Sequence, residues 1–323
     1  MSQVASTTEA IPQRSRRRDL HLADRIFYRV VKGTAWGMMV LLLSMIVVIM
    51  TMAWPALKEF GLRFFVTNDW DTLGDSFGAL ALIYGTVMSS IVALVISVPV
   101  SVGVALFLNE LAPRWLSKPV GFLVEMLAAI PSIVYGLWGL YVLAPFLRSE
   151  VQPFLSEAFG FLPLFEGPPL GVGMLCAGVV LAIMITPTIA SVCREVFAAI
   201  PVAVREAALG LGATRWEMLR ISVLRTSVSG VVGAVILGLG RAFGETMAVT
   251  MVIGNIEQIK LSLYEPAQTM ASILANQYAE ADSDLHLSAL TAIGFCLFVV
   301  SLVVNGSARF VVSKFEKRER GEV

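Results

Sequence analysis

Six apolar stretches, each about the length of a membrane-spanning helix, constrain the fold of this chain more than any other feature. A helix needs about 20 mostly apolar residues to cross the hydrocarbon core of a bilayer. The chain is 57% hydrophobic and 15% charged, whereas soluble domains are about 45–50% apolar and about 25% charged. We therefore predict an all-α integral membrane protein with six transmembrane helices. The stretches are residues 36–54, 80–107, 120–147, 171–193, 228–254 and 287–312.

Basic residues are distributed unevenly over the segments that join these stretches. If the N-terminus is cytoplasmic, 19 of the 24 Lys and Arg lie on the cytoplasmic side of the membrane. Four lie on the external side, and Arg241 lies within an apolar stretch. Cytoplasmic loops carry the excess of basic residues in membrane proteins, so both termini are predicted to be cytoplasmic. We divide the chain into a leader (1–35), a membrane domain (36–312) and a tail (313–323).

The sequence lacks the residue patterns of an enzyme. Its two histidines, His21 and His286, are expected on opposite sides of the membrane, so they cannot build one metal site or a catalytic triad. No lysine follows a glycine, which excludes a phosphate-binding loop of the Walker type. The three cysteines are isolated and form no C-x-x-C pair, so we expect them to face lipid or to be packed. We predict no catalytic residue, no metal and no cofactor.

The arginines of the leader are expected to contact lipid. The run Arg16–Arg18 precedes the first apolar stretch. Basic residues at the cytoplasmic edge of a membrane protein attract anionic lipid headgroups and fix orientation. Membrane lipids, and not nucleic acid, are therefore the predicted partner of this segment.

The longest predicted cytoplasmic loop, residues 194–227, is strongly patterned. Pro201 ends one helix, and the residues after it predict a short helix over 202–209. Gly210 and Gly212 then predict a turn.

A second helix is predicted directly after this turn. Thr214 is a candidate N-cap for residues 215–224, with Glu217 three residues later as in a capping box. A helix–turn–helix on the cytoplasmic face has a shape that can dock into a cleft of a soluble partner.

Within this loop, Glu206, Ala207 and Ala208 are followed after three residues by Gly212. This pattern resembles the EAA loop of the inner-membrane permeases of ABC importers. The resemblance implies that Arg205, together with those four residues, belongs to the segment that couples the permease to a separate ATPase subunit. The family pattern continues with an Ile and a Pro where this chain has Ser222 and Arg225, whereas Leu224 fits it.

Longer motifs resemble one branch of these permeases. They are FGALALIYGTVMSS at 77–90, EMLAAIPSIVYGLWG at 125–139, ITPTIASVCREVF at 185–197 and LGLGRAFGETMAVTMVIGN at 237–255. Together they are similar to the phosphate importer permeases of the PstC type, over about residues 20–315. The resemblance implies type I ABC importer permease architecture in a bacterial inner membrane. It also implies a PstA-type second permease, two PstB-type ATPase subunits and a PstS-type external phosphate-binding protein.

Arg241 and Glu245 are the most unusual residues of the fifth apolar stretch. Each charge costs about 2.5–3.5 kcal/mol at the centre of a membrane span, and positions i and i+4 share one helix face. Either the two residues form a structural ion pair or they face a polar path for the cargo. We favour the path, with Arg241 attracting an oxyanion and Glu245 either sensing a proton on phosphate or holding Arg241 in place.

Four hydroxyl residues are weaker candidates for the same path. Thr246 follows Glu245, and Thr186 and Thr188 flank Pro187 in the fourth stretch. Ser132 follows Pro131 in the third. For Thr186, Thr188 and Ser132, satisfying the backbone groups that a proline leaves free is an equally good explanation.

The remaining polar segments leave alternatives open. Glu125 is expected to pair with a cytoplasmic arginine or with the partner permease. The predicted external loops are 55–79, 148–170 and 255–286. The last is either a solvated connection or an amphipathic patch against the membrane surface or a partner.

Three other functions remain possible at this stage. The chain could be a permease for sulfate or molybdate, or a secondary transporter that works without an ATPase. It could also be a membrane adaptor that reports phosphate status, a role that is compatible with transport.

Overall fold

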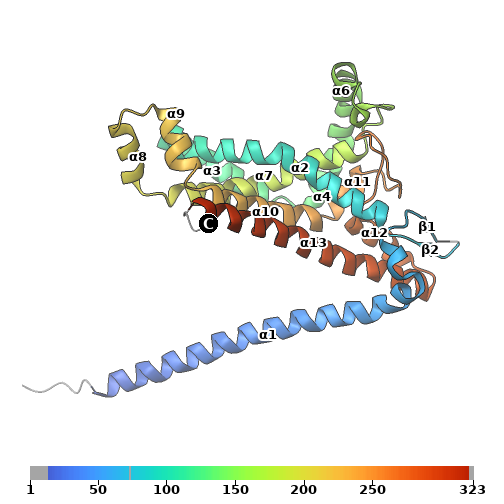
Figure 1. Ribbon diagram of the computed structural model, residues 1–323, viewed down its shortest axis with the longest axis horizontal. Helices are drawn as coiled ribbons and strands as arrows, with labels where there is room; N and C mark the ends of the chain where they lie inside the picture. Colours follow the sequence, from blue (N-terminus) through green and yellow to red (C-terminus); the bar gives the residue numbers. More distant parts are fainter. Residues whose placement is uncertain (1–13, 73, 320–323) are drawn as a thin grey trace, which may run out of the picture. The chain divides into compact units, whose positions relative to one another are not determined.

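The computed structural model describes residues 14–72 and 74–319, and the side chains within 24–72 and 74–310. The first 13 residues of the predicted leader and the last four of the predicted tail lie outside the described residues, as do the side chains of Arg16–Arg18. The chain divides into two units between Thr51 and Met52. Helix α1, Arg14–Phe60, contributes to both units (Figure 1).

Four described helices are long and apolar enough to cross a membrane, namely Asp24–Phe65, Leu80–Leu111, Met174–Ala198 and Asp284–Phe310. Two further helix pairs reach this length only when both members are counted as one bent span. The apolar stretches thus correspond to between four and six spans. One pair, Arg114–Ala128 with Ser132–Phe159, bends within the third stretch, and the other, Arg215–Leu224 with Val228–Gly244, bends just before the fifth stretch begins.

The third stretch is broken at Pro131. Helix α3, Arg114–Ala128, and the helical run Ser132–Phe159 meet at 91°. Proline has no N–H and disfavours helix at the residue before it, here Ile130. Our prediction of one continuous helix over 120–147 is therefore wrong. The run contains α4 (Ser132–Trp138), α5 (Ala144–Phe146) and α6 (Gln152–Phe159), joined by the π-helical turns Gly139–Leu143 and Leu147–Val151.

The fifth stretch is also interrupted. Helix α10, Val228–Gly244, is followed after two non-helical residues by α11, Met247–Val252. Glu245 has an extended backbone, with φ −72° and ψ 123°. The expected single helix over 228–254 is wrong for this reason.

The centre of the second unit is α7, Met174–Ala198, which packs against α2, α3, α10 and α11. Its main partner is α2, Leu80–Leu106, which ends in the π-helical turn Phe107–Leu111. Small residues allow this contact: a Cβ added to Gly178 would lie 2.4 Å from a methyl carbon of Val92. Cys176 and Cys193 of α7 and Cys296 of α13 are buried within the second unit, so these thiols are packed and do not face lipid.

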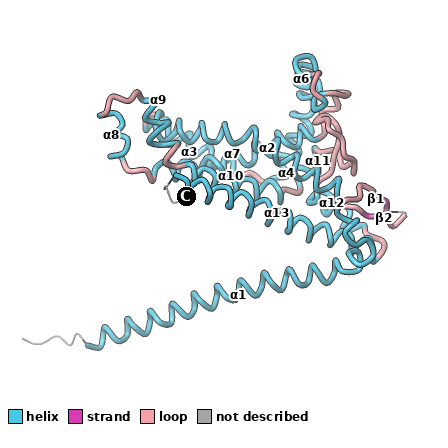
Figure 2. The backbone as a smooth tube through the Cα atoms, in the orientation of Figure 1, coloured by secondary structure: helices cyan, strands magenta, loops and turns pink. Residues whose placement is uncertain are grey.

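Residues 255–286 are only partly solvated, because 263–264 and 267–273 are buried whereas 258–261 and 278–280 are exposed. The backbone N–H of Leu175 donates to the carbonyl of Leu263 at 2.8 Å, and that of Met270 donates to Thr86 Oγ1 at 2.9 Å. Helix α12, Met270–Gln277, is buried over its first four residues. The middle of the segment thus belongs to the core, and the connection is solvated only on either side of it. Figure 2 shows its loop portions leading into α12.

Besides the core around α7, a separate group of buried residues lies where α13, Asp284–Glu319, begins. It includes the turn Gly61–Phe65 and a hairpin of β1 (Trp70–Asp71) and β2 (Ser76–Phe77). The rings of Phe77 and His286 are stacked with centroids 5.3 Å apart. Two short 3₁₀ turns, Pro163–Phe165 and Tyr278–Glu280, complete the described elements on this side.

Two short helices of the second unit lie at its opposite end. Helices α8, Val202–Gly210, and α9, Arg215–Met218, are far from α6 and the hairpin in Figure 1. The π-helical turn Leu219–Leu224 continues α9 and meets α10 at a bend of 69°.

Candidate functional site

A pocket of about 770 Å³ lies between α10 and α13, with one wall from α7. The polar side chains that line it belong to Thr188, Arg241, Asn305 and Arg309. Gly233, Gly240 and Gly306 also line it, and nothing lies within 4 Å of a Cβ added to any of them. These glycines therefore leave the pocket wide. Two guanidinium groups, a hydroxyl and an amide suit an oxyanion better than a cation.

Arg241 contacts Thr188 and does not pair with Glu245. Arg241 Nη1 donates a hydrogen bond of 2.9 Å to Thr188 Oγ1. No ion pair joins Arg241 to Glu245 among the described residues, because the helix ends between them. The expected i to i+4 pair on one helix face is wrong.

Glu245 has a structural contact of its own. Its Oε1 accepts a hydrogen bond of 3.3 Å from the backbone N–H of Ala248. The first N–H groups of a helix have no intrahelical partner, so this carboxylate helps α11 to begin. The end of α10 at Gly244 thus places Glu245 where its carboxylate bonds to the first turn of α11 instead of to Arg241.

The other predicted path residues do not line this pocket. Thr186 donates to the carbonyl of Ala182 in its own helix at 2.7 Å, and Thr246 donates to that of Gly244 at 3.2 Å. Ser132 begins α4 after Pro131. Of the predicted set, the pocket brings together Arg241 and Thr188.

Asn305 and Arg309 also line the pocket but are not among the residues that the sequence predicts for the path. Asn305 Oδ1 is buried without a hydrogen-bond partner in the described part of the chain. Arg309 lies near the end of the stretch 287–312 and is counted among the cytoplasmic charges, so its position gives no sign of a pocket. An asparagine inside that stretch was the available signal, since polar groups are costly in a membrane.

Replacing Thr188 with valine tests the contact to Arg241. The resemblance implies transport of an anion, and a hydrogen bond to a charged group contributes about 1.5–3 kcal/mol, so we expect uptake of the anion to fall about tenfold. Thr188→Ser keeps the hydroxyl and is the matched control, with activity near that of the unaltered protein. Initial uptake rates in reconstituted vesicles provide the measurement, and equal rates for both variants would contradict a role for the hydroxyl.

The segment 202–224 has the predicted helix–turn–helix. Gly212 adopts φ +88°, which residues with a side chain rarely adopt, and so it makes the turn after α8. Thr214 Oγ1 accepts from the Glu217 N–H at 3.3 Å, and Glu217 Oε2 accepts from the Thr214 N–H at 2.8 Å. The capping box is confirmed, and its hydrogen bonds hold the pKa of the Glu217 carboxyl below its usual value.

Apolar side chains project from this segment. Leu211, at the turn, is 91% exposed, and Trp216 in α9 is 65% exposed. Glu206 and Ala207 are also exposed on α8. An exposed apolar patch rimmed by polar residues is typical of a protein contact.

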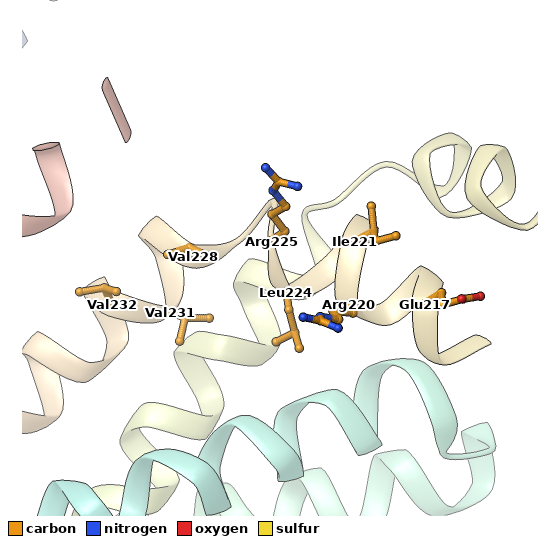
Figure 3. A pocket seen from close by; sticks show the side chains of 8 residues that line it. All are labelled: Glu217, Arg220, Ile221, Leu224, Arg225, Val228, Val231 and Val232. Atoms are coloured by element: carbon orange, nitrogen blue, oxygen red, sulfur yellow. The ribbon is translucent and has the colours of Figure 1, made fainter. Parts of the chain in front are cut away.

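A second pocket, of about 730 Å³, lies where the π-helical turn meets α10. Figure 3 shows Arg220 and Arg225 projecting to different sides of this turn, with Leu224 between them in sequence. Ser222 is buried and donates to the Val204 carbonyl at 3.4 Å. The two residues that depart from the EAA pattern thus lie at the bend, one buried and one exposed.

Glu125 pairs with Arg194, one of the arginines that the sequence predicts to be cytoplasmic. Arg194 Nη1 lies 3.2 Å from Glu125 Oε1, which joins α3 to the end of α7. The Glu125 side chain is 55% exposed. The pair is therefore well solvated and contributes little to stability.

Comparison with known proteins assigns the chain to a family. Residues 97–317 match the binding-protein-dependent transport system inner membrane component family. The phosphate transport system permease protein PstC of Mesorhizobium japonicum is 43% identical over 98% of this chain and 99% of its own length. The PstC protein of Pasteurella multocida is 45% identical over 93% of this chain and 94% of its own length. The chain belongs to the PstC family of these inner membrane components.

Solved structures show the same fold. A chain of a bacterial alginate ABC transporter, in complex with a pentasaccharide-bound periplasmic protein, covers 93% of this chain with a TM-score of 0.61 and 20% identity. That match covers 98% of the transporter chain. A chain of the MetNI methionine ABC transporter covers 73% with a TM-score of 0.52 and 19% identity, over 94% of its own length. This PstC-family chain is therefore a multi-pass membrane protein with type I ABC importer permease architecture.

Proposed function

We propose that this chain is a transmembrane subunit of an ATP-driven phosphate importer and forms half of the translocation path. The observation that carries the proposal is an arginine held in an otherwise apolar region beside an open pocket, in a chain of the PstC family. An intramembrane charge is costly and marks an ion pathway more often than a structural contact. Arg241 therefore supplies the positive charge that draws the anion into the membrane.

The donor groups of the pocket suit phosphate. Arginine presents a planar fork of donors that matches oxyanions, and its charge persists at all physiological pH values. Arg241 and Arg309 line the same pocket, and Thr188 already accepts a hydrogen bond from Arg241. Incoming phosphate would bond to Arg241 and to the Thr188 hydroxyl, which can donate its own proton.

The exposed face of α8, the turn and α9 is the proposed contact with the ATPase. Leu211 and Trp216 are exposed apolar groups, and Glu206 lies on the same segment. We propose a complex with a PstA-type permease, two PstB-type ATPase subunits and a PstS-type external binding protein in a bacterial inner membrane. In this complex, ATP binding would draw the two coupling segments together and open the path outward. Release of phosphate into the path and ATP hydrolysis would complete the cycle.

Reconstitution tests this function against its alternatives. The chain is purified with its partners in vesicles, and uptake of phosphate is measured with and without ATP and with competing sulfate or molybdate. We expect ATP-dependent uptake of phosphate that sulfate does not inhibit. Inhibition by sulfate would instead identify a permease for another oxyanion, and uptake without ATP would identify a secondary transporter.

Replacing Glu245 with glutamine tests how phosphate is distinguished from sulfate. Phosphate near neutral pH carries a proton that a carboxylate can accept in a hydrogen bond, whereas sulfate carries none. The glutamine keeps an oxygen that can accept from Ala248, so α11 should still begin normally. We expect the preference for phosphate over sulfate to fall about tenfold. Unchanged selectivity would restrict Glu245 to capping α11.

A further inference from the structure

The guanidinium of Arg205 is largely buried and joins α8 to the end of α2 and the end of α7. Its Nε and Nη2 both donate to Glu110 Oε1, at 3.1 and 2.7 Å. Its Nη2 also donates to the carbonyl of Phe197, and its Nη1 to that of Ile200, both at 2.7 Å. Four of the five guanidinium donors are therefore in use. Arg205 is not available to the proposed ATPase contact while these bonds persist.

The Arg205–Glu110 pair is shielded from water. The two side chains are only 15% and 8% exposed. Glu110 Oε1 also accepts from Asn109 Nδ2 at 2.7 Å. Removing one member of a buried ion pair leaves the other charged and uncompensated, which is far more costly than breaking an exposed pair.

The pair connects α8 to the two central helices. Glu110 lies in the π-helical turn that ends α2, and Phe197 lies in the last turn of α7. The last carbonyls of a helix carry partial negative charge and lack intrahelical partners, so a guanidinium satisfies them well. Displacement of α8 would therefore pull on the ends of α2 and α7 together.

These helices lead directly to the proposed anion pocket. Thr188, which contacts Arg241, precedes Phe197 by nine residues of α7, or about 13 Å along the helix axis. Near Thr188, the hydroxyl of Ser101 in α2 donates a hydrogen bond of 3.0 Å to the carbonyl of Thr186 in α7. A continuous set of bonded elements thus runs from α8 to the pocket.

We propose that Glu110 is a positioning residue for coupling: with Arg205, it ties α8 to α2 and α7 so that movement of α8 reaches the anion pocket. This inference rests on the proposed transport function. Glu110 does not contact the proposed cargo pocket, and its effect is exerted through Arg205.

The experiment uses the whole reconstituted transporter with its ATPase and external binding protein. Glu110→Gln removes the charge at nearly constant size, and Glu125→Gln is the matched control at the exposed pair with Arg194. Three quantities are measured on purified complexes: amide hydrogen exchange of residues 202–210, phosphate uptake and ATP hydrolysis. For Glu110→Gln we expect exchange of α8 to rise about tenfold and phosphate moved per ATP to fall about tenfold. Glu125→Gln should change neither.

A double variant tests whether the two residues act as one unit. Because Arg205 and Glu110 share their bonds, Arg205→Gln with Glu110→Gln should be no worse than Arg205→Gln alone. Additive losses would overturn the proposal. So would unchanged α8 exchange in Glu110→Gln, or uptake and ATP hydrolysis that fall in parallel. If the unaltered complex moves no phosphate, the proposed function fails, while the exchange measurement still decides whether Glu110 holds α8.

Discussion

Replacing Arg241 with glutamine is expected to reduce phosphate uptake about 100-fold at low phosphate concentration. Bonds to a charged donor contribute about 1.5–3 kcal/mol each, and every 1.4 kcal/mol corresponds to a factor of ten. Arg241 lines the pocket from α10 and is held there by Thr188. Glutamine keeps a donor but loses the charge that offsets desolvation of the anion. Initial uptake rates over a range of phosphate concentrations provide the measurement.

Two further variants separate charge from geometry. Arg241→Lys keeps the charge but not the planar fork of donors. We therefore expect its phosphate uptake to fall about tenfold, to a rate between those of the unaltered protein and Arg241→Gln. Arg148→Gln is the control, because Arg148 is exposed in the π-helical turn before α6 and does not line this pocket. Normal uptake by Arg241→Gln would contradict the path and leave Arg241 as a structural residue that holds α10 to α7.

The long helices could be predicted from apolar length alone. The stretches at 80–107, 171–193 and 287–312 correspond closely to α2, α7 and the membrane-length part of α13. The helix–turn–helix of residues 202–218 could also be predicted, because Pro201, Gly212 and the Thr214 capping box act through local backbone chemistry. Pro131 is also a local signal, since proline interrupts a helix. The apolar length of residues 120–147 nevertheless favoured a single helix over the bend that the structure has there.

The pairing of Arg241 could not be predicted in the same way. The i to i+4 rule assumes an unbroken helix, whereas α10 ends at Gly244 and Glu245 accepts a hydrogen bond from the backbone N–H of Ala248. The partner it does contact, Thr188, is 53 residues away in sequence. A single sequence does not show which residues so far apart along the chain lie close together in space. The residue type therefore identified the chemistry, and the tertiary structure identified the partner.

The segment 255–286 was misjudged for a related reason. Its polar and apolar residues alternate irregularly, and its buried carbonyls are satisfied by other segments instead of by its own helix. Examples are the carbonyls of Leu263 and Glu265, which accept from the first two residues of α7. Such bonds leave no periodic pattern, so composition suggested a loop where the fold has a buried connection.

Replacing Gly85 with alanine is expected to lower the thermal unfolding midpoint by about 5–10 °C. A Cβ at this position of α2 would lie 2.0 Å from the carbonyl oxygen of Gln268 and 2.9 Å from its carbon. Both are backbone atoms of the buried connection, so no side chain can rotate away. Overpacking of this kind costs about 1–3 kcal/mol, or more when the backbone must move, and each kcal/mol corresponds to about 2–4 °C in a protein of moderate size.

Gly103→Ala in the same helix is the matched control. Nothing lies within 4 Å of a Cβ added there, and alanine favours helix over glycine, so the midpoint should stay unchanged or rise slightly. The displaced segment in Gly85→Ala also carries Met270, whose N–H bonds to Thr86, the next residue of α2. Loss of this bond would loosen α12, and protease cleavage within 255–286 should become faster. Equal midpoints for the two variants would mean that the connection does not lie against α2 at Gly85.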